Sequence, residues 1–277
     1  MELRTISAEN KLSASLRELW NYRDLILLFV RRDFVSLYKQ TILGPIWIVL
    51  QPLLTTITYT IIFSRIAGLS TGGVPPVVFY LCGIIPWTFF AECLNKTSNT
   101  FITNANIFGK VYFPRLSVPV SIVISNLLSM AIQMILFFVI TILYVLSGNL
   151  KLEPGITLLM IPIYIILLAT LGLGLGLMVT ALTTKYRDLR FLVTFGVQLL
   201  MFATPVIYPI SSVSGKLKTI IELNPVSPLI EGMRHATLNC GELNPVKLLT
   251  SACLIILILF AGIFLFNRVE KDFMDTI

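Results

Sequence analysis

Two apolar stretches of the sequence carry amide, hydroxyl and aromatic side chains along one face of a predicted helix. The stripe consists of Trp47, Gln51, Thr55 and Tyr59 in the first stretch, and of Thr194, Gln198 and Tyr208 in the second. Aromatic rings stack on the apolar faces of sugars, while amides and hydroxyls bond to sugar hydroxyl groups. A hydrated path for a neutral, hydroxylated substrate is therefore one interpretation. Hydrogen bonding between neighbouring helices is the other, because glutamine does this well inside membranes.

Other arrangements of reactive side chains are absent from the sequence. It has 1 histidine and 4 cysteines without C-x-x-C spacing, so neither a metal site nor a Ser-His-Asp set is expected. There is no G-x-x-x-x-G-K-[ST] nucleotide loop; Gly172 and Gly176 instead predict a close helix–helix contact. Glu92, the one acid inside an apolar stretch, precedes Lys96 by one helical turn and predicts an ion pair with it. We therefore expect a chain that is not itself an enzyme and holds no cofactor.

The composition places these side chains inside a membrane protein. Of the 277 residues 56% are hydrophobic and 13% charged, and the mean hydropathy is +0.88. Soluble proteins carry about 25% charged residues, so lipid must surround much of this chain. The predicted fold is all-α and polytopic, with a single transmembrane domain over 1–277. It comprises a cytoplasmic or interfacial segment (1–40), a six-span region (41–267) and a cytoplasmic tail (268–277). The spans are expected near 41–66, 76–95, 117–147, 156–182, 190–209 and 247–267.

The distribution of basic residues predicts the orientation of these spans. With both termini in the cytoplasm, fifteen of the lysines and arginines lie on the cytoplasmic side and six on the outer side. Such an excess is typical of cytoplasmic loops. The net charge of +7 is then explained by topology, and no nucleic-acid partner is expected.

Two segments outside the spans are expected to be helical. An amphipathic helix is predicted over 8–24, either in the membrane interface or packed on a protein partner. Its apolar face consists of Leu12, Leu16, Leu19 and Trp20. The outer loop over 210–246 is unusually apolar, and Asn224-Pro225 predicts a break between two short helices there. This loop either re-enters the outer leaflet or covers the outer surface.

Five short motifs are spread along the chain. They are YKQTILGPIW at 38–47 followed by Pro52, NANIFGKVYFPR at 104–115, YRDL at 186–189, TPVIYP at 204–209, and Asn224-Pro225 with Arg234. In this order, and over nearly the whole chain, the sequence resembles the membrane subunits of type-2 ABC exporters for polysaccharides.

The resemblance implies an ATP-driven exporter in the bacterial cytoplasmic membrane, moving a lipid-linked polysaccharide such as an O-antigen or capsule-like glycan. It implies that two copies of the chain form a channel lined by the first and fifth spans. ATP and Mg²⁺ would be bound by two separate ATPase subunits. The residues implied to contact those subunits, unless they form a solvated charged loop, are Asn104, Asn106, Lys110, Arg115, Arg187 and Asp188. An exporter of lipids or drugs with the same architecture, and a membrane-embedded glycan-modifying enzyme, are the alternatives.

Overall fold

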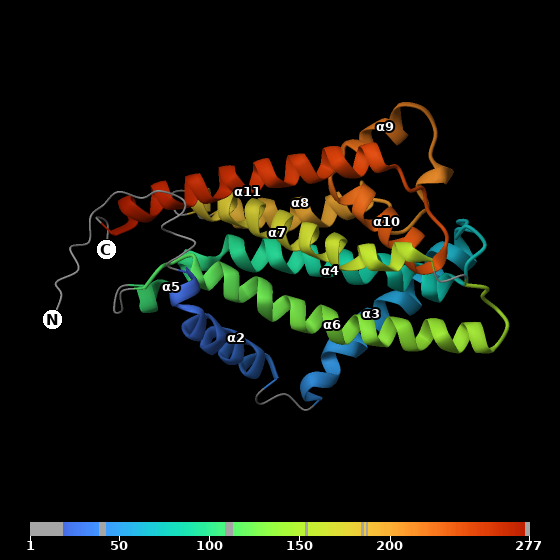
Figure 1. The fold of residues 1–277 in the computed structure, drawn as a ribbon, viewed down its shortest axis with the longest axis horizontal. Helices are drawn as coiled ribbons and strands as arrows, with labels where there is room; N and C mark the ends of the chain where they lie inside the picture. The colour runs from blue at the N-terminus through green and yellow to red at the C-terminus, as the bar shows by residue number, and fades with distance from the viewer. Residues whose placement is uncertain are drawn as a thin grey trace.

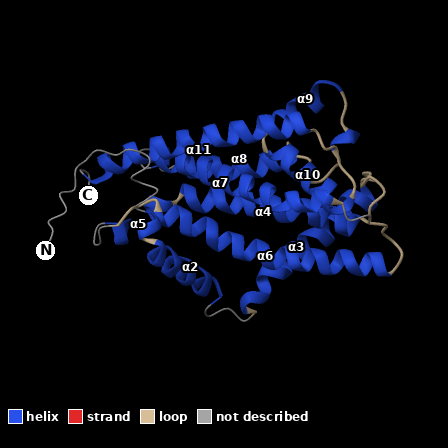
Figure 2. Ribbon diagram, in the orientation of Figure 1, coloured by secondary structure: helices blue, strands red, loops and turns tan. Residues whose placement is uncertain are grey.

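The computed structural model describes residues 19–38, 43–108, 113–152, 155–183, 186 and 188–274. Every regular element in this part of the chain is helical (Figure 2). The α-helices are α2 (Arg23–Tyr38), α3 (Trp47–Tyr59), α4 (Pro76–Ser98), α5 (Thr100–Phe108), α6 (Ser117–Leu146), α7 (Ile161–Thr183), α8 (Leu189–Phe202), α9 (Gly215–Leu223), α10 (Val226–Leu238) and α11 (Pro245–Met274). Short helical turns are η1 (Gly44–Ile46), η2 (Thr60–Ile66), η3 (Ile156–Met160) and η4 (Ile210–Ser212). The predicted all-α fold is confirmed.

Five helical segments are long and apolar enough to cross a membrane. They are Gly44–Ile66, Pro76–Ser98, Ser117–Leu146, Ile156–Thr183 and Pro245–Val269, which correspond to five of the predicted spans. The remaining prediction, 190–209, corresponds to the shorter helix α8, of 14 residues, and the turns that follow it. A helix of this length rises about 21 Å, against about 30 Å for the hydrocarbon core. The chain is thus a polytopic membrane protein whose fifth apolar stretch is helical over only part of its length.

The long helices lie side by side along the longest axis of the molecule (Figure 1). α5 and the last turns of α11 lie at one end, called the α5 end below. α9 and α10 lie at the opposite end, called the α9 end. The predicted topology requires this separation, because it places the loop after the second span and the 210–246 loop on opposite sides of the membrane. Which end faces the cytoplasm stays a prediction.

α4 is the central helix of the bundle. In an apolar stretch of 18 residues within this helix, 78% of the residues are buried inside the protein. The corresponding stretches of the other four long segments are 17% to 28% buried. Its neighbours are α3, α6, α7, α8 and α10. The rings of Phe79, Tyr80 and Phe90 are fully buried among them. α4 therefore has protein around it where the other spans have a free surface for lipid or for another chain.

Glycines on α7 bring the backbones of three helices together. A Cβ atom on Gly172 would lie 2.7 Å from the Cβ of Cys93 in α4, and one on Gly174 would lie 2.9 Å from the Cα of Leu259 in α11. Gly176 meets α4 in the same way as Gly172. The predicted packing face of Gly172 and Gly176 is confirmed. The contact of Gly174 with α11 is an addition that the sequence did not indicate.

α3 contains a proline whose effect is compensated by α6. Pro52 has no N–H, so it cannot donate to the carbonyl of Ile48 one turn earlier. The side-chain amide of Gln133 in α6 donates to this carbonyl instead, at 3.1 Å. A carbonyl freed in this way inside a membrane needs such a partner. Gln133 therefore attaches α3 to α6 at the level of the proline.

Replacing Gln133 by leucine is expected to lower the free energy of unfolding by about 1 kcal/mol, because the carbonyl of Ile48 loses this donor. The control is the same change in a Pro52→Ala background, where residue 52 supplies an N–H to that carbonyl. Unfolding of the two single variants and the double variant in detergent measures the coupling. Equal losses in both backgrounds would contradict the role assigned to Gln133.

α2 extends beyond the N-terminal helix predicted over 8–24. Residues 8–18 lie outside the described part of the chain, and α2 covers a later segment. Ile26, Phe29 and Val30 are buried, and their spacing places them on one face, with α6 as the neighbouring helix. α2 is therefore a further helix packed on the bundle, between the predicted helix and the first span, and the prediction for 8–18 stays a prediction.

The segment 210–246 contains the two predicted short helices, α9 and α10, with the break at Asn224-Pro225. α10 is buried over nearly all its length and contacts α4 and α7, whereas α9 has no buried residue. Asn224 closes the turn by accepting the N–H of Val226 at 3.1 Å and donating to the hydroxyl of Thr204 at 2.8 Å. Of the two alternatives, a surface cover fits α9, while α10 is an internal helix of the bundle. Its depth in the membrane stays a prediction.

Candidate functional site

The polar stripe of α3 lies on the surface of the bundle. Trp47 is 45% exposed, Gln51 is exposed, and Thr55 and Tyr59 are half-buried. The hydroxyl of Thr55 donates to the carbonyl of Gln51 at 3.0 Å, within the same helix. Among the described residues, the amide of Gln51 has no partner on another helix. The stripe is therefore accessible to a second chain or to a ligand.

The polar stripe of α8 is exposed as well. Val197 is the one buried residue of this helix, all of which the structure describes, and Thr194 and Gln198 are exposed. The hydroxyl of Thr194 donates to a carbonyl of its own helix at 2.9 Å. Tyr208 lies beyond the helix, and its hydroxyl donates to the carbonyl of Phe202 at 3.0 Å. Tyr208 thus stabilises the end of α8, a role that the sequence did not indicate.

The stripe of α3 contacts α8 through one of its residues, Tyr59. The hydroxyl of Tyr59 in α3 lies 3.6 Å from the sulfur of Met201 in α8. The ring of Tyr59 also packs edge-on against Phe63 and Tyr80, at 5.3 and 6.3 Å between ring centroids. α3 and α8 therefore touch at this position, while the main neighbours of α8 are α7 and α4. That a substrate contacts their polar residues stays a prediction.

The residues predicted to contact an ATPase subunit differ in their surroundings. The amide of Asn104 is buried and donates to a carbonyl within α5 at 3.1 Å. Arg115 is buried with its guanidinium 5.6 Å from the ring centroid of Phe108. Both side chains contribute to the fold in this structure. Asp188 is exposed at the start of α8. Lys110 and Arg187 lie outside the described residues, and so does the side chain of Asn106.

A buried arginine at the α9 end holds the turn that follows α8. Arg234 in α10 is fully buried and donates to the carbonyls of Pro205, Val206 and Tyr208, the last at 3.3 Å. Its guanidinium lies 3.9 Å from the ring centroid of Phe79 in α4. The backbone after α8 makes no regular helix, and carbonyls in such a segment need donors when they are buried. Arg234 supplies them.

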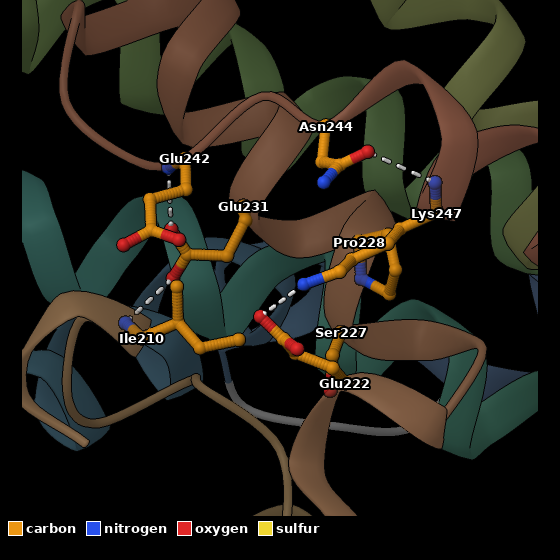
Figure 3. A pocket seen from close by; sticks show the side chains of 8 residues that line it. All are labelled: Ile210, Glu222, Ser227, Pro228, Glu231, Glu242, Asn244 and Lys247. Carbon is orange, nitrogen blue, oxygen red and sulfur yellow. Dashed lines mark hydrogen bonds and ion pairs between the residues drawn. The ribbon is translucent and has the colours of Figure 1, made fainter. Parts of the chain in front are cut away.

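Glu231, one turn before Arg234 in α10, completes this arrangement (Figure 3). Its carboxylate accepts the N–H groups of Ile210 at 3.3 Å and Glu242 at 3.2 Å, and lies 3.1 Å from the guanidinium of Arg234. Both members of this ion pair are buried. Figure 3 shows Glu231 between the segment after α8 and the loop before α11. We call this pair the α10 clamp, because it joins both connecting segments to α10.

A glycine in α4 makes room for the α10 clamp. A Cβ atom on Gly83 would lie 2.7 Å from the guanidinium of Arg234 and 2.8 Å from the carbonyl oxygen of Val206. The clamp was missed at the level of the sequence, where Arg234 served only to support the resemblance. The available signal was a Glu–Arg pair at i, i+3 in an otherwise apolar segment.

A cleft of about 570 Å³ lies toward the α5 end of the bundle, where α2, α4, α5, α6 and α8 meet. Basic residues, amides and hydroxyls make up most of its lining: Arg32, Asp33, Ser36, Asn95, Lys96, Asn99, Ile102, Thr103, Asn104, Val118, Ile122, Ser125, Asn126, Arg190, Phe191 and Thr194. The predicted ion pair of Lys96 with Glu92 is confirmed, at 2.9 Å, and Lys96 also donates to Asn126 at 3.0 Å. Of the stripe residues only Thr194 reaches this cleft. Its volume suits a small organic ligand.

Comparison with known proteins decides the family. The model of the ABC-2 type transporter family matches residues 24–238. The chain belongs to this family. It is 25% identical to the O-antigen export system permease protein RfbA of Myxococcus xanthus, over 95% of this chain and 98% of that protein. It is 28% identical to the protein of the same name from Klebsiella pneumoniae, over 92% and 95% of the two chains. It is also 22% identical to the polysialic acid transport protein KpsM of Escherichia coli, over 88% and 93%. The predicted resemblance is confirmed.

In this ABC-2 family protein, labelling of a cysteine thiol can test which end of the molecule faces outward, and Cys240 is a candidate for such labelling. Cys240 lies in the loop between α10 and α11, half-buried, with its Cβ 3.9 Å from the position of a Cβ on Gly72. Burial raises the pKa of the Cys240 thiol to about 12. Thiol reagents attack the thiolate, so a raised pKa slows labelling. Cys240 is therefore a poor reporter of which end faces outward.

We expect maleimide to label Cys240 at pH 8 about 1,000-fold more slowly than an exposed thiol, because its thiolate fraction is lower by that factor. The matched control is Lys216→Cys, an exposed position in α9 at the same end, in a chain whose native cysteines are replaced. The rate at Cys240 should rise about tenfold for each unit of pH. Similar rates at the two positions would show that the Cys240 thiol is not shielded.

Proposed function

We propose that this chain is the channel-forming permease subunit of an ATP-driven exporter that moves a lipid-linked polysaccharide across the bacterial cytoplasmic membrane. An O-antigen or a capsule-like glycan is the cargo that the relatives' names favour. The observation that carries the proposal is family membership together with similarity to two O-antigen export permeases and a polysialic acid transport protein over nearly their full length. Both termini would face the cytoplasm, with the α5 end inside and the α9 end outside.

The energy for export would come from separate ATPase subunits, which bind ATP and Mg²⁺. The sequence supports this division because it contains no phosphate-binding loop of the G-x-x-x-x-G-K-[ST] type. Two such subunits would sit at the α5 end and contact the segment 104–115 and the residues around Asp188. Two copies of the chain would enclose the channel. The surfaces of α3 and α8 support this arrangement, because among the described residues Gln51, Thr194 and Gln198 make no hydrogen bond to another helix of the same copy.

The path would run along Trp47, Gln51, Thr55 and Tyr59 of α3 and along Thr194, Gln198 and Tyr208 at α8. Within one chain the alternative role of the glutamines finds no support, since neither Gln51 nor Gln198 bonds to another helix among the described residues. Amides turned toward lipid would remain without partners at a cost of several kcal/mol. A hydrated channel, or the second copy beside it, removes that cost.

Deleting the gene for this chain is expected to abolish the surface glycan and to cause lipid-linked glycan to accumulate inside the cell. Complementation with the wild-type chain should restore export, whereas Gln51→Leu or Gln198→Leu should give normal assembly and reduced export. Surface glycan is measured with a lectin or antiserum, and assembly by size-exclusion chromatography with the ATPase subunit. Ile57→Ala, an exposed position of α3 on the side away from the stripe, is the control. Normal surface glycan after deletion would refute the proposed function.

A further inference from the structure

The cleft at the meeting point of α2, α4, α5, α6 and α8 has an excess of basic groups. Its lining includes Arg32, Lys96 and Arg190 but only one carboxylate, that of Asp33. Asp33 lies 2.8 Å from Arg32, and Glu92 outside the lining lies 2.9 Å from Lys96. These two carboxylates leave the third cation of the cleft without a counter-charge.

Arg190 is that third cation. In the described part of the chain no carboxylate pairs with it, and its guanidinium lies 4.7 Å from the ring centroid of Phe191. It stands in the first turn of α8, where the helix dipole adds positive potential. A guanidinium held against a ring at a helix N-terminus is well suited to a phosphate group, which it can bind with two parallel hydrogen bonds.

The same cleft offers partners to a hydroxylated ligand. Four asparagines and four hydroxyl residues contribute to its lining: Asn95, Asn99, Asn104, Asn126, Ser36, Thr103, Ser125 and Thr194. The Oδ1 atom of Asn95 is buried and has no hydrogen-bond partner in the structure. A buried carbonyl oxygen without a donor is costly, and a phosphate cannot satisfy it because a phosphate is itself an acceptor. A hydroxyl of the ligand can.

We propose that this cleft binds a phosphate ester attached to a sugar, with Arg190 holding the phosphate and Asn95 accepting a hydroxyl of the sugar. The inference rests on the proposed function, because it assigns the cleft to a phosphate that would join the glycan to its lipid. The cleft volume of about 570 Å³ accommodates a group of that size. The site differs from the stripe on α3, none of whose residues line it.

The test uses the full-length chain in lipid nanodiscs, with binding measured by isothermal titration calorimetry. Glucose 1-phosphate is the probe that carries a phosphate and a sugar without a lipid, and methyl glucoside is its neutral counterpart. We expect glucose 1-phosphate to bind and methyl glucoside to bind at least tenfold more weakly. Arg190→Gln should weaken glucose 1-phosphate at least tenfold, and Arg190→Lys should recover part of the loss. Lys216→Gln, an exposed lysine at the opposite end of the bundle, should leave binding unchanged.

Farnesyl diphosphate distinguishes a lipid-linked phosphate from a soluble one. Competition between farnesyl diphosphate and glucose 1-phosphate supports the lipid-linked end as the ligand. Absence of competition overturns that assignment, as does equal binding of both sugars or equal affinity in Arg190→Gln. Size-exclusion chromatography shows whether Arg190→Gln is folded. If it is not, the affinity of Arg190→Lys is compared with that of the wild-type chain instead. These binding outcomes are independent of the effect of deleting the gene. The cleft assignment can therefore fail while the proposed function stands, and the proposed function can fail while the cleft still binds the probe.

Discussion

Replacing Arg234 by methionine is expected to lower the free energy of unfolding by about 3–5 kcal/mol, the usual effect of removing one partner of a buried ion pair. Methionine retains much of the apolar volume but none of the donors. The carboxylate of Glu231 would remain buried without its counter-charge, and the carbonyls of Pro205 and Val206 would lose their donor. The segment after α8 would then lose its attachment to α10.

Thermal unfolding in detergent, followed by tryptophan fluorescence, measures this loss. Arg65→Met is the matched control, because Arg65 is exposed at the end of the first span and forms no ion pair in the described structure. Its effect should stay below about 0.5 kcal/mol. Glu231→Gln keeps the shape and one acceptor oxygen, so its effect should fall between the two. An Arg234→Met variant as stable as Arg65→Met would contradict the clamp.

Adding a single methyl group at the contact of α7 and α11 is expected to disturb the bundle. A Cβ on Gly262 would overlap the carbonyl oxygen of Gly174, and a Cβ on Gly174 would lie 3.0 Å from the backbone nitrogen of Leu259. Backbone atoms cannot move aside as the tip of a flexible side chain can. Gly174→Ala and Gly262→Ala should therefore each cost about 1–3 kcal/mol by overpacking. Gly262→Ala should have the larger effect.

The same chemical change at Gly196 is the control. Gly196 lies in α8, and a Cβ there has no neighbour within 4 Å. Gly196→Ala should leave stability unchanged or raise it by up to about 1 kcal/mol, because alanine favours the helix. Yield of folded protein and the midpoint of unfolding in SDS compare the three variants. If all three behaved alike, helix propensity rather than packing would decide their stability.

Much of the fold could be predicted because the membrane constrains the sequence directly. An apolar run such as Ser117–Leu146 is long enough to cross the hydrocarbon core, and few other structures satisfy its backbone there. Hydropathy did not indicate which span is central, because the buried α4 and the largely exposed α11 are both apolar. Burial on all sides comes from tertiary packing, and composition alone does not encode it.

Local patterns that the prediction did not use account for other differences. Ile26, Phe29 and Val30 have the spacing of a helix face, yet the adjacent Leu27 and Leu28 are exposed and obscure it. α8 ends at Phe202, earlier than the predicted boundary near residue 209, for a different reason. Pro205 has no N–H with which to extend the helical hydrogen bonds, and Arg234, 29 residues later in the chain, donates to the carbonyls of the turn that follows.

Of the candidate site, the sequence indicated the stripes but not the cleft. The stripes lie on single helices, where spacing alone places Gln51 and Thr55 on one face. The cleft gathers residues from five helices, so its assembly depends on contacts between elements far apart in the chain, such as Arg32 and Arg190. A search for charged residues near the ends of the spans would have found these arginines without showing that they meet.

The glycine contacts among α4, α7 and α11 have a mechanical consequence. Helices whose backbones touch cannot roll or slide past one another without collision, so these three form a rigid frame. α8 rests on that frame with a single buried residue, and α3 is joined to α6 by the hydrogen bond of Gln133. In the proposed exporter, a change of shape during transport would therefore be taken up by α3 and α8. The bond of Gln133 to α3 and the bonds of Arg234 to the segment after α8 would then be the points at which these two helices stay attached.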